Sequence, residues 1–367
     1  MLEPMQIKFS PNYTITPEMA KFLLEIEATK EKILHLPLTP KVLASLRETA
    51  RLFTTHYSTM IEGNRLQPDQ VEKVLHHDEH FPGRERDEQE IKGYYAALEQ
   101  VEKWGARNVP ITEKLIQSLH ALVLSNGRKT VKATPYRDGQ NLIRDGRTRR
   151  IVYMPPEAKD VSPLMKTFIK WLSKGEEIPC PILAAIAHYQ FVTIHPYYDG
   201  NGRTARLLTT LILHLGGYDL KGIYSLEEYY ALHLEDYYTA ISIGPSHNYY
   251  LGRAEADITS WITYFMKGMA DSFGKVWQQM QSAGQDGAQD QSKLLRELDP
   301  RQRKALEIFR SQNIVTAKQI GKLFHFKPRT SAQLCQKWVK AGFLKVVDPS
   351  NKKRSYRLTK KYSRLLE

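Results

Sequence analysis

Residues 195–206 read His-Pro-Tyr-Tyr-Asp-Gly-Asn-Gly-Arg-Thr-Ala-Arg and combine side chains of three chemical kinds. The imidazole of His195 titrates near neutral pH, which suits a general base that removes a proton from a hydroxyl. Asp199 offers the hard oxygen ligand that Mg²⁺ prefers. Arg203 and Arg206 are three residues apart, so on a helix they would share one face and could both contact phosphate. The segment therefore predicts an enzyme site for a nucleotide.

Two glycines, Gly200 and Gly202, flank Asn201 in this segment. Glycine permits positive φ and lets a phosphate approach the backbone N–H groups closely. Apolar residues at helical spacing on both sides predict two helices, which leaves residues 199–202 as a tight loop at a helix N-terminus. Each feature alone is common in turns and on solvated helix faces, but their occurrence together in this order favours a phosphate site.

The surrounding sequence predicts a mainly α-helical domain over residues 41–281, with residues 1–40 packed against it. Apolar residues recur at intervals of three and four over residues 40–57, 88–104, 112–124, 160–172, 181–194, 204–215, 225–243 and 257–281. The exception is residues 140–155, where Asp145 and Gly146 separate β-prone residues. This pattern predicts a short hairpin in an otherwise helical domain.

The first of these helices ends near Ser58 and Glu62, which lie four residues apart and hence on one face. Gly63 is a typical residue just after a helix end. A carboxylate in the last turn opposes the helix dipole, so we expect Glu62 to have a specific partner. The alternative is a solvated glutamate.

The net charge of +13 lies entirely in the C-terminal fifth of the chain. Residues 296–367 contain 19 Lys and Arg against 5 Asp and Glu, a balance of +14. Small polar residues over 282–295 predict a linker before this basic part. The asymmetry indicates a separate domain with a polyanionic partner.

This basic part, residues 296–367, predicts three helices and two strands: a helix opened by Asp299, helices over 316–324 and 329–341, and strands over 343–347 and 354–358. The order resembles a winged helix-turn-helix module with the third helix as the reading helix. Phosphate contacts would come from Arg329, Lys337, Lys340, Lys352, Lys353 and Arg354. Winged helices also bind proteins, and lysine-rich surfaces can be merely solubilising, so DNA and protein partners both stay open.

The chain of 367 residues is 41% hydrophobic and 25% charged, which is ordinary for a soluble globular protein. Its N-terminal residues contain no apolar segment of the kind found in secretory signals. The apolar stretch 207–215 is too short and too polar to span a bilayer. Cys180 and Cys335 are the only cysteines and lie far apart, which argues against a disulfide framework or a zinc site. We expect a cytoplasmic protein without membrane association.

Residues 195–206 resemble the signature of Fic-domain proteins, H-P-F-x-[D/E]-G-N-G-R-x-x-R, with Tyr197 in place of Phe. Since that aromatic residue is expected to pack inward, the added hydroxyl bears on packing more than on chemistry. The resemblance extends to Tyr136 and Arg137, to residues 153–156 and to residues 236–238. It covers roughly residues 40–270 and implies a Fic-type helical bundle with a β-hairpin flap.

The resemblance implies transfer of AMP from ATP to a Ser, Thr or Tyr hydroxyl of a target protein and of the chain itself. His195 would be the catalytic base and Asp199 would hold Mg²⁺. The phosphates would be held by Gly200, Asn201, Gly202, Arg203 and Arg206. A relative with Lys at the position of Gly202 is a kinase, so the glycine favours adenylylation.

The hairpin resembles the flap of this family, whose edge pairs with an extended target segment. Ile151, Val152 and Tyr153 would form that edge and cover the adenine. Tyr237 and Tyr238 would line the adenosine pocket, although an aromatic pair in the helical core explains them equally well. His188 lies on one helical face with His195, and without a third ligand it is a core histidine rather than a metal ligand.

Residues 58–64 resemble the inhibitory motif of Fic proteins, [S/T]-x-x-x-E-[G/N], on a helix over residues 40–62. The resemblance implies that Glu62 pairs with Arg206 in the place of the γ-phosphate, so that the enzyme inhibits itself. Glu62 would also suit removal of AMP from a target by activating water. Transfer of a different nucleotide or of a phosphoryl group, an ATP-sensing DNA-binding regulator, and a homodimer are alternatives that the sequence leaves open.

Overall fold

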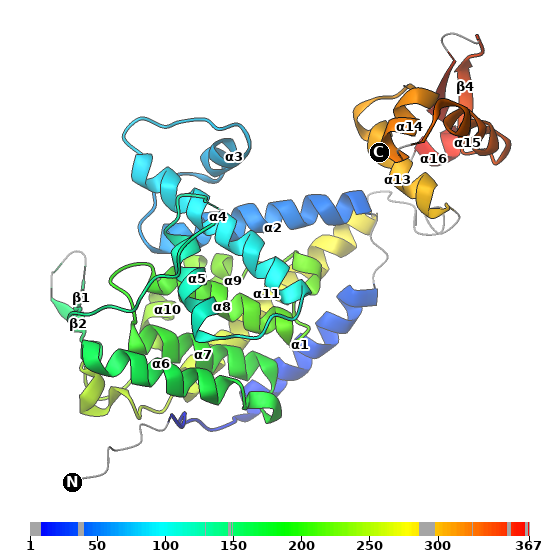
Figure 1. Cartoon of the computed structure of the whole chain (residues 1–367). Coiled ribbons are helices and arrows are strands. Elements are labelled where there is room, and N and C mark those ends of the chain that lie inside the picture. The colour runs from blue at the N-terminus through cyan, green and yellow to red at the C-terminus, as the bar shows by residue number, and fades with distance from the viewer. Residues whose placement is uncertain are drawn as a thin grey trace. The chain divides into compact units, whose positions relative to one another are not determined.

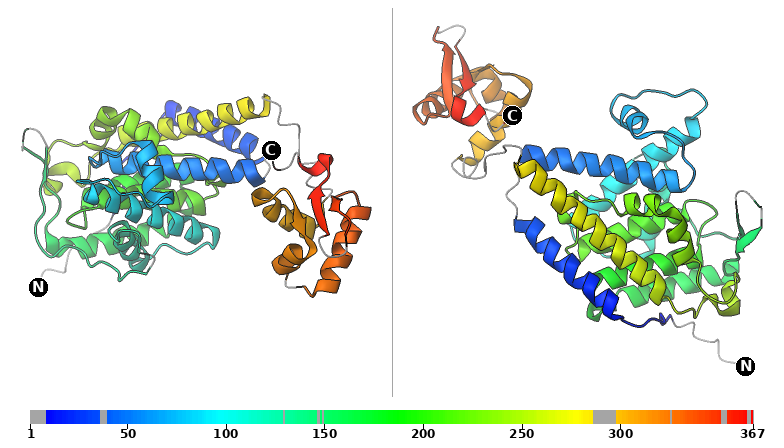
Figure 2. Two further views of the ribbon diagram at one scale, coloured as in Figure 1. Left: turned by 90° about the horizontal axis from the view of Figure 1, so that it is seen from above. Right: turned by 180° about the vertical axis from the view of Figure 1, so that it is seen from behind.

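The structure is a computed structural model of the chain, and it describes residues 9–35, 40–128, 130–145, 148, 150–285, 298–324, 326–350, 354–363 and 366. The chain divides into two compact units: Met1–His35 with Leu46–Gln279, and Leu36–Ser45 with Met280–Glu367. Figures 1 and 2 show the elements of both units. The first unit is almost entirely helical, and the second combines helices with a small sheet.

The helices of the first part of the chain are, in order, α1 (Pro17–His35), α2 (Pro40–Ile61), α3 (Pro68–His76), α4 (Glu85–Ala106), α5 (Glu113–Val123), α6 (Ala158–Leu172), α7 (Cys180–Ile194), α8 (Asn201–Leu215), α9 (Leu226–Leu232), α10 (Leu234–Ile241) and α11 (Thr259–Gln285). A short antiparallel hairpin of β1 (Ile143–Arg144) and β2 (Ile151–Tyr153) interrupts them. The predictions of a mainly α-helical fold and of a hairpin within residues 140–155 are confirmed.

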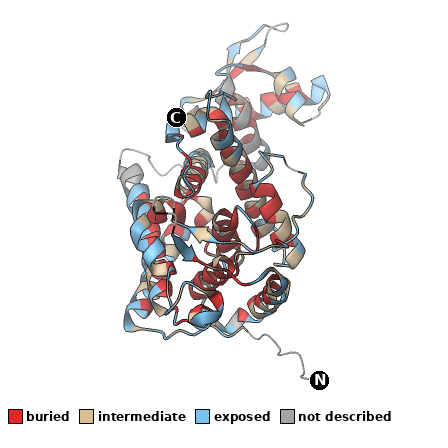
Figure 3. Cartoon of the chain, turned by 90° about the vertical axis from the view of Figure 1, so that its left-hand side faces the viewer, coloured by how far each residue is buried: buried red, intermediate tan, exposed pale blue. Residues whose placement is uncertain are grey.

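Helices α7 and α8 form the centre of the first unit. α7 buries apolar residues on every side, including Ile182, Ile186 and Phe191, as is typical of a helix enclosed by others. α8 packs against α7, α4 and α5. Figure 3 shows buried residues gathered on the inner helices. This packing fixes the two helices whose adjoining ends carry residues 195–206.

Helix α1 packs on the same unit through a narrow apolar stripe. It buries Met19, Ile26 and Ile33, which are seven residues apart. Ahead of it, Phe9 lies edge-on to Trp171, with ring centroids 4.9 Å apart. The sequence analysis predicted neither α1, although its sequence is rich in apolar residues, nor the shorter α3.

Two helix boundaries differ from those predicted. The single helix predicted over 225–243 is wrong, since α9 ends at Leu232 and α10 begins at Leu234, with His233 at φ −121° and ψ 43°. The apolar spacing continues in phase across this break and no Gly or Pro marks it, so periodicity does not reveal it. α8 begins at Asn201 rather than after Gly202, because Gly200 takes the left-handed conformation (φ 74°) immediately before the first turn.

The second unit contains α13 (Pro300–Ser311), β3 (Val315–Thr316), α14 (Ala317–Phe324), α15 (Pro328–Lys340), β4 (Leu344–Asp348), β5 (Ser355–Leu358) and α16 (Lys360–Ser363). Its strands form an antiparallel sheet in the order β3-β5-β4. Trp338, Phe343 and Tyr356 are buried at its centre. The sequence analysis missed β3 and α16, which are too short for a periodic pattern. Lys352 and Lys353 lie outside the described residues.

The stretch between the two units differs in part from the predicted linker. α11 continues to Gln285, so residues 282–285 are helical. Residues 286–297 lie outside the described part of the chain. Across the described ranges, no helix has the length and apolar composition that crossing a membrane requires.

Candidate active site

His195 lies at the C-terminal end of α7 with φ 51° and ψ 60°, a left-handed conformation that residues with a Cβ seldom adopt. Arg137 holds this turn in place. Its Nε donates to the carbonyl oxygen of His195 at 2.9 Å, and its backbone N–H donates to that of Pro196 at 2.9 Å. Its remaining nitrogens donate to the carbonyl oxygens of Gly139 and Pro156. Arg137 therefore ties the histidine turn to both ends of the hairpin segment.

The protonation of His195 follows from one contact and from burial. Nδ1 lies 3.2 Å from the carbonyl oxygen of Val192, which can only accept, so Nδ1 carries the proton and Nε2 keeps its lone pair. Burial lowers the pKa of His195 to about 4, although the hydrogen bond to Val192 opposes this shift. The imidazole is therefore neutral near pH 7 and can accept a proton at Nε2.

Asn201 shapes the loop between α7 and α8. Its side-chain oxygen accepts from the backbone N–H of Tyr197 at 3.0 Å, and its Nδ2 donates to the carbonyl oxygen of the same residue at 2.7 Å. Asp199 accepts from the backbone N–H of Gly200 at 2.6 Å. We expected the Asn201 side chain to hold phosphate. The structure instead uses it within the loop, and since the N–H of Gly200 is taken by Asp199, the backbone N–H groups of Asn201 and Gly202 are the ones that could face a ligand.

The ring of Tyr197 is buried and stacks on that of His120, with centroids 3.6 Å apart and planes at 12°. Nε2 of His120 donates to the carbonyl oxygen of Asp199 at 2.9 Å. Burial lowers the pKa of His120 to about 4, so this ring is a neutral support for the loop. The sequence analysis did not single out His120. Its one signal was its position on the buried face of the helix predicted over 112–124.

Arg206 of α8 is 2% exposed and contacts the end of α2. Its Nη2 donates to Glu62 Oε1 at 2.8 Å and to the carbonyl oxygen of Ser58 at 2.9 Å, while its Nε donates to Ser58 Oγ at 2.7 Å. Burial opposes the charged form, but the Glu62 carboxylate and nearby tyrosines outweigh it and raise the pKa of Arg206. The structure thus brings together Ser58, Glu62 and Arg206 as the sequence predicted.

The Glu62 carboxylate also lies directly against the first turn of α8. A Cβ added to Gly202 would lie 2.3 Å from Glu62 Oε1 and 3.2 Å from Arg206 Nη1. Only a glycine lets the carboxylate approach this turn so closely. Glu62 therefore occupies the surface where an anionic ligand of the helix N-terminus would lie.

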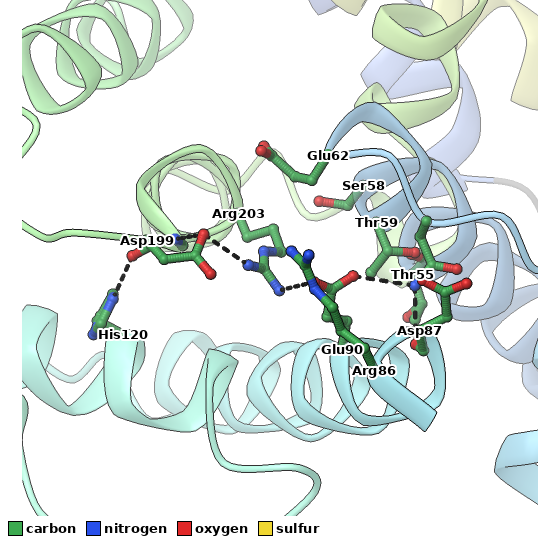
Figure 4. A network of polar contacts seen from close by, with 12 residues as sticks. Thr55, Ser58, Thr59, Glu62, Arg86, Asp87, Glu90, His120, Asp199 and Arg203 are labelled. Carbon is green, nitrogen blue, oxygen red and sulfur yellow. Dashed lines mark hydrogen bonds and ion pairs between the residues drawn. The ribbon is translucent and has the colours of Figure 1, made fainter. Parts of the chain in front are cut away.

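Arg203 and Arg206 both lie on α8, but their guanidinium groups contact different residues. Its Nη2 donates to Asp199 Oδ1 at 3.3 Å, and its Nη1 lies 3.8 Å from Glu90 Oε1 of α4. Figure 4 shows Arg203 between these two carboxylates. We expected both arginines to reach one phosphate chain from a shared face. In the structure their guanidinium groups are held by different elements.

A cavity of about 240 Å³ joins the flap, the histidine turn and α8. It is lined by Ile61, Glu62, Ile143, Val152, Tyr153, Val192, His195, Gly202, Arg206, Tyr237, Tyr238, Ile241, Ser242 and Arg253. Of the predicted site residues, those outside this lining are Ser58, Ile151, Asp199, Gly200, Asn201 and Arg203. The cavity thus combines a base, a cation and an aromatic wall.

The two predicted pocket tyrosines differ in their surroundings. Tyr237 is buried, and its hydroxyl lies 3.0 Å from Nε2 of His188, whose Nδ1 lies 3.1 Å from Thr209 Oγ1. Tyr238 is half exposed and donates to the carbonyl oxygen of Ile61 at 3.4 Å. Tyr237 therefore belongs both to the core and to the cavity wall. His188 is a fully buried core histidine whose pKa burial lowers to about 3.

The base of the flap is anchored next to the histidine turn. The hydroxyl of Tyr153 donates to the carbonyl oxygen of Thr193 at 2.5 Å, and the guanidinium of Arg253 lies 5.2 Å from the centre of its ring. Ile151 and Val152 stay exposed on the strand. Arg253 is a further lining residue that the sequence analysis missed, because it ends a short irregular helical segment, Tyr249–Arg253, which is too short for a periodic pattern.

A comparison with protein families finds that residues 110–213 match the model of the Fic/DOC family. The chain contains a Fic domain. The matched range runs from just before α5 to near the end of α8, so it includes the flap, His195, Gly202 and Arg206. Glu62 and the second unit lie outside the Fic domain match.

Curated relatives of the Fic domain carry the name of one activity. The protein adenylyltransferase Fic of Nematostella vectensis is 31% identical over 202 residues, which are 54% of this chain and 45% of that protein. The protein adenylyltransferase fic-1 of Caenorhabditis elegans is 30% identical over 250 residues, 66% of this chain and 47% of that protein. The chain thus spans about half the length of these relatives.

Solved structures share the fold. A Fic family protein from Desulfovibrio desulfuricans has a TM-score of 0.59 at 25% identity and covers 96% of this chain, which covers 99% of it. Fic-1 from Caenorhabditis elegans has a TM-score of 0.58 at 24% identity, with coverage of 72% and 73%. The first of these matches extends over both units of the chain.

Proposed function

We propose that the protein transfers AMP from ATP to a Ser, Thr or Tyr hydroxyl of a target protein, and to its own chain. The observation that carries the proposal is the placement of His195 and Arg206 on one cavity at the N-terminus of α8. A base for the hydroxyl and a cation for the phosphate chain are the groups that this transfer needs. The names of the two curated relatives support the same activity.

In the proposed reaction, Nε2 of His195 accepts the hydroxyl proton while the oxygen attacks the α-phosphorus of ATP. The bond from that phosphorus to the bridging oxygen breaks, and pyrophosphate leaves with the bonding electron pair. The N–H groups of Asn201 and Gly202, that of Gly200 once Asp199 releases it, and the dipole of α8 favour the phosphates. Arg203 neutralises the leaving pyrophosphate and Arg206 engages the γ-phosphate. Catalysis of this kind depends on positioning and on charge stabilisation.

Asp199 is the residue that we propose for Mg²⁺. Its side chain is 64% exposed, and its Oδ1 is shared by Gly200 and Arg203. Within the described ranges, no group of three or more His, Cys, Asp and Glu could hold a metal by itself. One carboxylate together with substrate phosphates is a common way to bind Mg²⁺. When bound, the ion would neutralise charge on the triphosphate.

Glu62 is proposed as an intramolecular inhibitor. Its carboxylate takes the Nη2 donor of Arg206 and lies against Gly202, the two places at which the outer phosphates of ATP would bind. ATP could then enter the cavity without reaching its reactive alignment. The same carboxylate could instead orient water for removal of AMP from a modified target, which supports a reverse activity at the same site.

Mass spectrometry of the full chain after treatment with ATP and Mg²⁺ tests the proposed function. We expect the mass of one AMP group on a hydroxyl side chain, and more of it when Glu62 is replaced. A panel of other nucleoside triphosphates would separate AMP transfer from transfer of another nucleotide. Addition of a phosphate instead of AMP, or tight ATP binding without any product, would contradict the proposal.

The low pKa of His195 predicts an unusual pH dependence. A base with a pKa of about 4 is almost fully neutral at pH 5.5, whereas a histidine with the ordinary value of 6.5 would be about 90% protonated there. We therefore expect self-labelling by a Glu62→Ala variant to change by less than about twofold between pH 7 and pH 5.5. Initial rates at constant ionic strength, with circular dichroism as a check on folding, measure this. A tenfold loss with a midpoint near 6.5 would contradict it.

A second function, DNA binding, is supported by the second unit. Its order of helix, strand, helix, helix, strand, strand is the order of a winged helix. α15 is the helix that would enter the major groove. Five of its exposed residues are basic or carry amides, which suit phosphates and base edges: Arg329, Gln333, Gln336, Lys337 and Lys340.

Replacing both Lys337 and Lys340 with glutamate is expected to weaken binding of the full chain to duplex DNA. Two lost phosphate contacts should reduce the magnitude of the slope of log K against the logarithm of the salt concentration by about 2. Fluorescence anisotropy over a salt series measures this slope. Lys361→Glu in α16 is the control, since it changes one charge on another element. If the unchanged chain has no affinity for DNA at low salt, the DNA function is wrong.

The location that we propose is the cytoplasm. Cys180 and Cys335 are both free thiols, one in each unit. Burial raises the pKa of both thiols, to about 12 and about 11, so neither is set up for disulfide chemistry. Both observations suit a reducing compartment.

A further inference from the structure

The guanidinium of Arg203 is buried with few hydrogen bonds of its own. The residue is 1% exposed, and neither its Nε nor its Nη1 has a hydrogen-bond partner among the described residues. Its one hydrogen bond to a described residue is the 3.3 Å contact with Asp199. A buried cation in this condition needs a nearby negative charge and unused acceptors that can come to it.

Glu90 of α4 supplies that charge. Its side chain is 11% exposed, and its Oε1 lies 3.8 Å from Nη1 of Arg203. The same carboxylate accepts from Arg86 Nε at 3.1 Å and from Asn64 Nδ2 at 3.3 Å. Figure 4 shows Glu90 between Arg203 on one side and the end of α2 on the other. Glu90 is thus held by neutral and exposed partners while its charge faces Arg203.

Asn64 connects this carboxylate to the turn that follows α2. Its Nδ2 also donates to the carbonyl oxygen of Asp87 at 2.9 Å, and its Oδ1 accepts from the backbone N–H of Leu66 at 3.1 Å. Asn64 is buried and lies two residues beyond Glu62. Its amide therefore fixes both the turn and the orientation of the Glu90 carboxylate.

We propose that Glu90 is a positioning residue for Arg203 and that Asn64 orients it. The inference rests on the proposed function, in which Arg203 receives the leaving pyrophosphate. Among the described residues, two carboxylates form ion pairs with Arg203: Asp199 at 3.3 Å and Glu90 at 3.8 Å. Without Glu90, the guanidinium would keep only Asp199 of these two, the residue that we assign to Mg²⁺. Glu90 keeps Arg203 from pairing fully with Asp199, so both groups stay available to the substrate. The turn after α2 then acts on both arginines: Glu62 pairs with Arg206, and Asn64 orients Glu90, which positions Arg203.

The test uses the full chain with Glu62→Ala as the parent, so that turnover is not limited by Glu62. Adding Glu90→Gln keeps the shape of the side chain and removes its charge. We expect kcat for AMP transfer to fall about tenfold and the Kd of Mg²⁺–pyrophosphate to rise about fivefold. The matched control is Arg86→Ala, which removes an exposed partner of the same carboxylate and should change both quantities by less than about twofold.

Asn64→Asp is a second variant that leaves Glu90 in place. It replaces the amide donor by a carboxylate of the same shape, which repels Glu90, and we expect the same two changes at about half the size on a logarithmic scale. The Kd of Mg²⁺–pyrophosphate is measured by calorimetry, so it is read even if the parent transfers no AMP and the proposed function fails. If Glu90 only neutralised Arg203, its charge would weaken pyrophosphate binding, and Glu90→Gln would bind pyrophosphate more tightly. Unchanged or tighter pyrophosphate binding in Glu90→Gln would therefore overturn the inference.

Discussion

Replacing Glu62 with alanine is expected to raise the rate at which the full chain labels itself with AMP by about 10- to 100-fold. The variant loses the 2.8 Å contact with Arg206, so that guanidinium becomes free for the γ-phosphate. A hydrogen bond to a charged group contributes about 1.5–3 kcal/mol, and about 1.4 kcal/mol corresponds to a factor of ten. Incorporation of labelled AMP from ATP under initial-rate conditions measures the effect.

Two variants make this result specific. Glu62→Gln keeps the size of the side chain without its charge, so its rate should lie between those of the parent and Glu62→Ala. Glu48 lies on the same helix but contacts Tyr95 and His76 instead of Arg206. Glu48→Ala should therefore leave the labelling rate unchanged. If Glu62→Ala labels no faster than the parent, Glu62 does not inhibit the enzyme.

Replacing His195 with alanine is expected to lower labelling by about 100- to 10,000-fold, both in the parent and in the Glu62→Ala background. The change removes the Nε2 lone pair that would accept the hydroxyl proton. It leaves Arg206, Gly202 and the aromatic wall of the cavity in place. Single-turnover labelling at saturating ATP separates the lost chemical step from any loss of binding.

Binding of ATP is the control for His195→Ala. Its Kd should change by less than about threefold, since the imidazole acts on the hydroxyl rather than on the phosphates. The variant places alanine at a left-handed backbone position, which suits alanine no better than histidine. The thermal unfolding of the variant and the parent should therefore be compared as well. Labelling at the parental rate would exclude His195 as the base.

The helical fold and the centre of the site could be predicted from the sequence because their signals are local. Residues 195–206 are contiguous, and the helices on either side have clear apolar periodicity. The contact between Glu62 and Arg206, which are 144 residues apart, was implied by the family resemblance, whereas the helix dipole indicated only that Glu62 has a specific partner. Local patterns and the resemblance to one family together supplied these residues.

The roles of the residues that support the site could not be found in this way, although Arg137 belongs to the segments that resemble the family. Arg137 acts through its contacts with backbone carbonyls of two other segments, and such contacts leave no pattern in the sequence. Glu90 occupies a helical position that looks like any exposed glutamate until Asn64 and Arg203 are brought to it. The side chain of Asn201 could not be assigned either, because whether an amide faces a ligand or its own loop depends on a turn of four residues.

The pairing of Glu62 with Arg206 also bears on the lifetime of the folded protein. A buried guanidinium that loses its carboxylate keeps neutral partners such as the two oxygens of Ser58, and uncompensated charge in the interior destabilises the native state. Under the proposed inhibition, a change of Glu62 that frees Arg206 for ATP therefore also loosens the structure around it, unless a triphosphate takes the vacated place. On this proposal, inhibition and stability depend on the same side chain, so a permanently active variant would need a negative charge from another residue to keep the stability of the parent.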